Sequence, residues 1–296
     1  MDFKELEYFS TIVKCGNLTH AARLLYVSQP TLSKFLQKLE EDLGLVLFQR
    51  GSRRLKLTYA GQRYYAHVER ILSQKREMDA EMTDILRSDR GVLYVGIPPF
   101  RCSFSLPKVL PIFHKEFPQV QFRIVEAPSA VLDQKLLNGE IDLAFYMSFE
   151  RITGLSYQVM RSDKMYAILS KGHLLESKAA QIGEFSLEWL TGQTLLLQNR
   201  TQRQGQYILQ ELEKRHIQPA EILESSNIRA AAALAANGYG IGFLSGELLE
   251  HLELNIPFGA YPLRNCTLHI ESVAAWRTGD YLPRYAQAFI KLMEQV

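Results

Sequence analysis

The pattern of apolar and polar positions predicts three short helices within the first 43 residues. Apolar residues recur at helical spacing from Phe3 until Gly16 breaks the pattern. Thr19 is placed to cap a second helix, His20 to Leu25, in which two alanines leave room for a neighbouring helix. A third helix is expected over residues 29–43. This order of helices, with a short turn before the third, indicates a helix-turn-helix.

The third helix has two faces of different chemistry. Ser28 should cap it, and Pro30 is tolerated in the first turn, where a missing N–H leaves no bond unmade. The face toward the core is apolar and consists of Leu32, Leu36, Leu39 and Leu43. The opposite face carries side chains that can bond base edges or phosphates, namely Gln29, Ser33, Lys34, Gln37 and Lys38. We interpret this segment as a recognition helix.

Residues 45–58 place apolar runs on both sides of a tight basic turn at Gly51 and Ser52, which predicts a two-stranded wing. Its cations would lie beside the phosphates and release counterions; they are Arg50, Arg53, Arg54 and Lys56. The chain has 34 Lys and Arg against 32 Asp and Glu, but its first 58 residues have nine against six. The alternative is a generic three-helix domain with a solvated basic loop. The order of the parts favours DNA binding.

A long helix is expected over residues 58–88, where Thr58 can act as the cap. Apolar positions alternate by four and three along it and form a heptad seam at Tyr64, Val68, Ile71, Lys75, Met78, Met82 and Ile85. The segment is too short to supply a second helix against which the seam could pack, which favours pairing with the same helix of another subunit. The alternative is packing on its own domain. Lys75 would weaken the seam and could fix its register.

From Val92 onward the pattern alternates between buried strands and amphipathic helices. The first set is expected at residues 92–97, 106–117, 120–126, 131–137 and 141–146. A second set is expected at 155–170, 194–198, 204–216, 221–224, 228–237 and 241–244. A strand at 267–276 and a helix at 281–293 should return to the first half. The chain therefore predicts two α/β halves with parallel strands and a crevice between them.

The crevice should bind a small molecule where strand ends meet helix N-termini. The loop over residues 98–103 is the leading candidate, since two prolines and a Phe make a stiff apolar mouth and leave Ser103 to hold an anionic group. Arg101 either adds a charge-assisted bond or points to solvent. The full set of candidate contacts is Pro99, Phe100, Arg101, Ser103, Pro128, Ser129, Tyr146, Asn199, Arg200 and Thr201. A small carboxylate-bearing metabolite is the default ligand.

The N-terminal residues resemble the signature of LysR-type transcriptional regulators. The similarity is carried by Leu6-Glu7-Tyr8-Phe9, by residues 16–22 and 27–34, by Leu39-Glu40, Leu43-Gly44, Leu47-Phe48 and Leu57-Thr58, and by Gly61. More loosely, it continues through Leu106-Pro107, Phe117-Pro118, residues 139–144 and residues 238–242. The resemblance implies a dimer-forming linker helix and an effector domain folded like periplasmic solute-binding proteins. It also implies major-groove contacts at Gln29, Pro30, Ser33 and Lys34, with Arg53 in the wing.

Several other motifs carry no chemistry. The glycines at 238–242 follow a helix and precede a strand, which is the reverse of a dinucleotide fingerprint. The three cysteines lack C-x-x-C spacing, and Cys102 is either an ordinary buried thiol or an oxidant sensor with a lowered pKa. The histidines have no metal-ligand spacing, and no catalytic set appears. We expect no enzyme, no metal and no cofactor other than the effector.

The expected organisation is a winged helix-turn-helix at 1–58, a linker helix at 59–88 and an effector-binding α/β domain at 89–296. Subdomain I should span about 89–161 and 266–296, and subdomain II about 162–265. The residues expected at DNA are Ser28, Gln29, Pro30, Thr31, Ser33, Lys34, Gln37, Lys38, Arg50, Arg53 and Arg54.

The expected partners are promoter DNA, a second copy in a homodimer or dimer of dimers, and RNA polymerase as a further candidate. With no signal peptide or membrane span, we expect a cytoplasmic protein. The alternative is a metabolite-binding protein or enzyme whose N-terminal helices serve only assembly.

Overall fold

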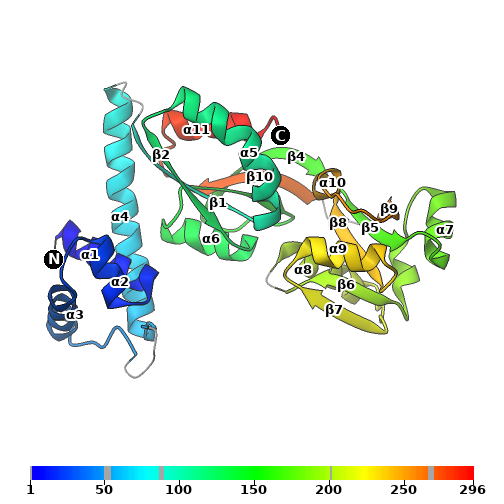
Figure 1. Cartoon of the computed structure of the whole chain (residues 1–296), viewed down its shortest axis with the longest axis horizontal. Helices are drawn as coiled ribbons and strands as arrows, with labels where there is room; N and C mark the ends of the chain where they lie inside the picture. Colours follow the sequence, from blue (N-terminus) through cyan, green and yellow to red (C-terminus); the bar gives the residue numbers. More distant parts are fainter. Residues whose placement is uncertain (1, 50–54, 87–89, 201, 266–269) are drawn as a thin grey trace. The chain divides into compact units, whose positions relative to one another are not determined.

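The computed structural model describes residues 2–49, 55–86, 90–200, 202–265 and 270–296. The predictions for Arg50, Arg53, Arg54, Thr201, the turn at residues 51–52 and the side chain of Ile85 lie outside the described residues. The chain divides near residue 88 into two compact units, which are taken separately below. Figure 1 labels the elements of each unit.

Three helices open the first unit, α1 (Phe3–Cys15), α2 (Leu18–Leu24) and α3 (Gln29–Leu43). Gly16 ends α1 in the left-handed conformation, at φ 59°, and Ser28 caps α3, both as predicted. The prediction that Thr19 caps α2 is wrong. Asn17 is the cap, because its side-chain oxygen accepts hydrogen bonds from the amides of Thr19 and His20 at 2.8 and 3.0 Å.

The core of the first unit buries Leu32 and Leu36 of α3, with Leu39 half-buried. Leu43 is 40% exposed, so its predicted burial is wrong. The apolar stripe shifts instead to Phe35, whose ring meets Tyr8 of α1 edge-on.

An antiparallel bridge between Phe48 and Leu57 joins the segments on either side of the predicted basic turn. The amide of Gln49 donates to the Lys56 carbonyl at 2.8 Å. Glu40 of α3 accepts hydrogen bonds from the amides of Leu47 and Phe48 at 2.6 and 3.1 Å. The base of the predicted wing is therefore fixed to α3.

The long helix α4 (Tyr59–Ile85) begins at Thr58, whose hydroxyl accepts a hydrogen bond from the Gly61 amide at 3.0 Å. Its first half packs on α1, where buried Glu69 accepts a hydrogen bond from Ser10 and pairs with Lys14 at 3.1 Å. Val68 is 1% exposed in this same core. The first half of α4 is thus part of the N-terminal unit.

The second unit contains two mixed sheets of five strands (Figure 1). The first has the order β2-β1-β3-β10-β4 and is built from β1 (Gly91–Ile97), β2 (Val120–Glu126), β3 (Leu143–Ser148), β4 (Leu155–Asp163) and β10 (Ile270–Arg277). Strands β1, β2 and β3 run parallel, and β10 returns antiparallel between β3 and β4. Helices α5 (Pro99–Glu116) and α11 (Arg284–Met293) cover one face, and α6 (Ser129–Asn138) covers the other.

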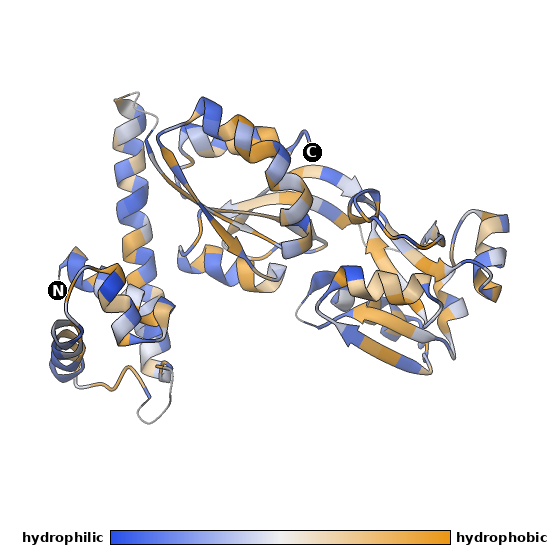
Figure 2. Cartoon of the chain, viewed as in Figure 1, coloured by the Kyte–Doolittle hydropathy of each residue, from blue (hydrophilic) through white to orange (hydrophobic). Residues whose placement is uncertain are grey.

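The second sheet has the order β7-β6-β8-β5-β9. Its strands are β5 (Met165–Ser170), β6 (Thr194–Gln198), β7 (Glu221–Ser225), β8 (Ile241–Ser245) and β9 (Phe258–Pro262). Helices α7 (Leu174–Ile182) and α8 (Arg203–Lys214) pack on one face, and α9 (Ile228–Ala236) and α10 (Gly246–Glu250) on the other. A short 3-10 helix, η1 (Leu187–Leu190), precedes β6. Figure 2 shows hydrophobic stretches in the strands of both sheets. The strands β3 and β8 are buried along nearly their whole length, as expected for strands covered on both faces.

The predicted loop at residues 98–103 is wrong, because α5 already begins at Pro99. Pro99 occupies the first turn, where its missing N–H costs nothing, and Pro107 and Pro111 lie inside the same helix. Pro107 lacks the N–H that would bond the Ser103 carbonyl, and Pro111 lacks the N–H that would bond the Pro107 carbonyl, so both missing bonds lie along one side of the helix. The sequence pattern also missed α7, η1, α10 and β9.

Candidate functional site

The outward face of α3 presents the side chains predicted to contact DNA. Gln29, Ser33, Lys34, Gln37 and Lys38 are all exposed. Ser28, Pro30 and Thr31 are exposed at the start of the helix, where the Ser28 and Thr31 hydroxyls lie 2.7 Å apart. Gln37 donates to Glu41 at 2.8 Å. A DNA-reading role for these residues stays a prediction.

Tyr26, in the turn between α2 and α3, was missed by the sequence reasoning. It is 96% exposed and has a positive φ of 55°, which is uncommon for a residue with a side chain. A tyrosine ring is rarely so exposed, and this one lies in the turn three residues before α3 begins. Only its place directly before Val27 and Ser28 could have singled it out.

The predicted seam of α4 divides into two parts. Val68 is buried within its own chain and cannot face a partner, which corrects the prediction for this residue. Tyr64 is half-buried and packs its ring on Phe9 with centroids 4.8 Å apart, and its role in pairing stays a prediction. Farther along, Ile71, Met78 and Met82 are 38%, 55% and 49% exposed. An exposed apolar row of this kind is suited to pairing with a second helix.

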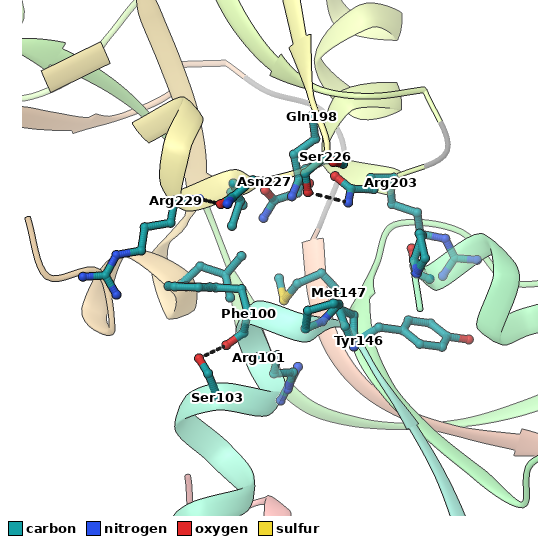
Figure 3. A pocket seen from close by; sticks show the side chains of 18 residues that line it. Phe100, Arg101, Ser103, Tyr146, Met147, Gln198, Arg203, Ser226, Asn227 and Arg229 are labelled. Carbon is teal, nitrogen blue, oxygen red and sulfur yellow. Dashed lines mark hydrogen bonds between the residues drawn. The ribbon is translucent and has the colours of Figure 1, made fainter. Parts of the chain in front are cut away.

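A cavity of about 470 Å³ opens in the second unit, between residues of its two sheets (Figure 3). Four helix N-termini reach it, at Pro98 for α5, Ser129 for α6, Gln202 for α8 and Asn227 for α9. Such termini carry partial positive charge. At α9 the Asn227 side chain already accepts hydrogen bonds from the amides of Arg229 and Ala230, whereas α5 and α8 have no side-chain cap. The wall formed by the described residues includes Arg101, Arg203 and Arg229 and no acidic side chain.

Seven of the predicted contacts line this cavity, namely Pro99, Phe100, Arg101, Ser103, Pro128, Ser129 and Tyr146. Asn199 and Arg200 do not line it, and the Arg200 side chain is 75% exposed and pairs with Glu224 at 3.3 Å. Pro98, from the leading candidate loop, also lines it. The missed lining residues are Met147, Gln198, Gln202, Arg203, Gln204, Ser226, Asn227, Ile228, Arg229 and Leu248.

The first turn of α8 lies directly against the end of β6. A Cβ on Gly205 would come within 2.0 Å of the Gln198 carbonyl oxygen, so only glycine permits this approach. The contact places Gln198, Arg203 and Gln204 together on the wall. A helix start after a strand end was the available signal, but the predicted helix began one residue too late, at Gln204.

Arg101 neither points to solvent nor stands free. It is 5% exposed, and its Nη2 pairs with Glu247 Oε1 of α10 at 2.9 Å. Burial lowers the pKa of the Arg101 guanidinium, while Glu247 and Asp163 oppose that shift. Ser103 donates its hydroxyl to the Phe100 carbonyl at 2.7 Å, so that proton is already used.

Arg203 is 3% exposed and reaches from α8 to residues of the first sheet. It pairs with Asp133 of α6, donates to Ser148 at 3.1 Å and lies 4.9 Å from the centre of the Tyr146 ring. Tyr146 donates its hydroxyl to Asp133. Burial raises the pKa of the Asp133 carboxyl, although Tyr146 and Arg203 pull it down, and burial with the adjacent Asp133 raises the pKa of Tyr146.

The remaining predictions concern cysteines, metals and membranes. Burial and Glu126 raise the pKa of Cys102, which is the opposite of an activated thiol. Within the described ranges, no group of three or more His, Cys, Asp or Glu could hold a metal ion. No helix in that part of the chain is long and apolar enough to cross a membrane.

Family models match the chain over both units. The bacterial regulatory helix-turn-helix of the lysR family matches residues 3–62, and the LysR substrate binding domain matches residues 86–296. The uncharacterized HTH-type transcriptional regulator YybE of Bacillus subtilis is 26% identical over 290 residues, covering 98% of this chain and 97% of the relative.

Solved structures of similar architecture cover nearly the whole chain. A full-length OxyR variant from Pseudomonas aeruginosa has a TM-score of 0.74 at 24% identity, covering 99% of this chain and 98% of that one. Full-length CbnR, in a complex with its target DNA, has a TM-score of 0.62 at 23% identity and covers 100% and 99%. At these identities the structures establish a shared fold.

Proposed function

We propose, since this chain belongs to the LysR family of transcriptional regulators, that the outward face of α3 reads promoter DNA and that the cavity of the second unit binds an anionic effector. Proteins of this family regulate transcription and are not enzymes, so assembly is not the only task of the N-terminal helices. The proposal assigns a role to each polar surface described above.

The proposal for DNA rests on the exposed polar face of α3. Gln29, Ser33 and Lys34 project from its first two turns, where a recognition helix meets base edges. Lys38 and Lys56 would contact phosphates, together with the wing arginines Arg50, Arg53 and Arg54. CbnR, which was solved in a complex with its target DNA, shares the fold and supports DNA as the ligand.

A mobility-shift assay with DNA flanking the protein's own gene tests this surface. We expect specific binding whose affinity falls steeply with salt, because phosphate contacts release counterions. Binding without salt dependence would remove the physical basis of the proposal.

A single subunit would read half of a symmetric site. We propose that the exposed row Ile71, Met78 and Met82 joins two copies of α4, and that dimers pair further into tetramers. RNA polymerase is a further proposed contact, and DNA as the ligand implies a cytoplasmic location.

The proposal for the effector is carried by one observation, the convergence of four helix N-termini and three arginines on a cavity wall whose described residues include no acid. Phe100, Met147, Ile228 and Leu248 give the same cavity an apolar side. A volume of about 470 Å³ suits a small molecule. A carboxylate with a compact apolar body satisfies both parts.

Thermal-shift measurements with matched pairs of compounds test the effector class. Benzoate and hexanoate have the shape of benzamide and hexanamide but carry a charge, so only the carboxylates should stabilise the protein. Stabilisation by the amides or by cations alone would overturn the proposal.

A further inference from the structure

Two buried ion pairs connect the halves of the second unit beside the cavity. In one pair the arginine belongs to the first half, and in the other pair it belongs to the second. In the Arg101 pair, an arginine of α5 beside the first sheet reaches Glu247 of α10 beside the second. In the Arg203 pair, an arginine of α8 beside the second sheet reaches Asp133 of α6 beside the first. Both arginines line the cavity, so a ligand would meet both pairs.

The Arg203 pair is closely held. Asp133 accepts hydrogen bonds from both Arg203 and the Tyr146 hydroxyl, and Ser148 accepts a second guanidinium N–H at 3.1 Å. The guanidinium lies over the Tyr146 ring. Its Nε makes no hydrogen bond but has the Glu150 carboxylate at 3.7 Å, so each of its three nitrogens lies near an acceptor. Partners on several sides make an exchange of Asp133 for another anion unfavourable.

The Arg101 pair is incomplete although it is equally buried. Its two side chains are 6% and 5% exposed, yet Nε and Nη1 of Arg101 and Oε2 of Glu247 have no hydrogen-bond partner. Buried donors and acceptors without hydrogen-bond partners destabilise the folded protein, and a new partner removes part of that cost. This guanidinium therefore has unused donors at the wall of a cavity that already favours anions.

The start of α10 is constrained around Asp163 but open around Glu247. Asp163 accepts hydrogen bonds from the amides of Lys164 and Glu247 at 2.7 and 2.8 Å. A Cβ on Gly246 would lie 2.5 Å from an Asp163 oxygen, so glycine permits this contact. Ser245 is fully buried and its hydroxyl has no partner either. The backbone of α10 is anchored, while the side chains at its start leave hydrogen bonds unmade.

We propose that the anionic group of the effector replaces Glu247 as the partner of Arg101, so that the Arg101 pair is the contact between halves that the ligand breaks. The proposal rests on the anionic effector proposed above and adds the contact through which it acts. The exchange keeps the buried guanidinium paired and releases Glu247 together with the side chains at the start of α10. The Arg203 pair remains in place and keeps the halves connected.

The test compares isosteric amide substitutions in the two pairs of the full-length protein. Glu247→Gln removes the carboxylate with which the ligand competes, so the affinity for benzoate or hexanoate should rise about tenfold or more. Asp133→Asn makes the same chemical change in the other pair and should change that affinity by less than about threefold. Titration calorimetry of the wild type and both variants supplies the dissociation constants, with benzamide and hexanamide as neutral probes.

Arg101→Lys provides a second measurement if Glu247→Gln fails to fold. It keeps the charge but removes the guanidinium N–H groups, and it should weaken carboxylate binding about tenfold.

Each outcome decides the proposal. If carboxylates bind the wild type but Glu247→Gln binds them no better, the exchange is wrong while the effector class stands. If Asp133→Asn alone tightens binding, the exchanging arginine is Arg203 and the proposal fails. If no carboxylate binds the wild type or Glu247→Gln, the exchange is overturned, and binding of the neutral amides alone would also overturn the effector class.

Discussion

The outward face of α3 and the cavity of the second unit are both polar surfaces, but they are constructed in opposite ways. Residues 28–38 of one continuous segment supply the α3 face. Its side chains are exposed, while the apolar residues on the opposite face of the helix are buried. Residues from many separate segments supply the cavity, where two of the charged groups, Arg101 and Arg203, are buried and paired between the two halves. The first surface depends on local helical periodicity, and the second depends on the whole fold.

This difference predicts that Arg203→Met destabilises the second unit strongly. The change leaves Asp133 buried without its cation, and loss of one partner from a buried pair costs about 3–5 kcal/mol. Calorimetric unfolding should show a lower transition for the second unit and an unchanged one for the first. Arg200→Met is the matched control, because Arg200 is exposed and only its surface pair with Glu224 is lost. Equal effects of both substitutions would contradict the structural role of the Arg203 pair.

Leu32→Ala makes the reciprocal change behind the DNA-reading face. Leu32 is fully buried, and truncation of such a leucine costs about 3 kcal/mol through lost burial and the cavity that remains. The transition of the first unit should fall while carboxylate binding by the second is kept. Leu43→Ala, on the same helix but 40% exposed, should cost well under half as much. Loss of ligand affinity in Leu32→Ala would show that the two surfaces are not independent.

The same contrast explains which parts of the protein could be predicted. Ser28 and the polar face of α3 follow from a helical repeat, a cap and a turn, all of which are local in sequence. The prediction for Leu43 was wrong because a helical repeat does not show which of its positions the neighbouring helices cover. For the same reason the repeat did not show that Phe35 packs in the core.

The cavity was predicted in part because its segments follow strand ends, a general rule for α/β folds. Proline suggested a loop at residues 98–103, although Pro99 is compatible with a first helical turn. The burial of Arg101 depends on its pair with Glu247, which is far away in sequence, and no local sequence pattern predicts that pair. Arg203 and Asp133 are separated in the same way, so the wall was recognised while its charge pairing was not.

Ser33→Ala should reduce discrimination between specific and random DNA. A base-edge hydrogen bond contributes about 1 kcal/mol or more of discrimination, and Ser33 is exposed on the reading face. Lys38→Ala provides the comparison, because Lys38 is exposed on the same helix and is proposed to contact phosphate. Loss of its charge should weaken binding to all sequences and lower the salt slope by about one. Fluorescence anisotropy with both duplexes at several salt concentrations measures these effects. Identical changes for the two variants would assign Ser33 to phosphate contact instead.

The smallest expected effect concerns how stability depends on pH, which Asp133→Asn should change in addition to the stability lost with the buried pair. Burial raises the Asp133 pKa above its ordinary 3.8, so between these two values the native state binds more protons than the unfolded chain. The contribution of Asp133 to the free energy of unfolding is therefore fully present below pH 3.8 and is lost as pH rises through the folded-state pKa. Urea unfolding across that range should show the wild type losing more stability with rising pH than Asp133→Asn. Glu224→Gln, at an exposed carboxylate, should not change the slope in this way. A wild type that gained stability relative to Asp133→Asn over the same range would mean that Arg203 outweighs burial, and that the charges behind the cavity stabilise the fold as ions.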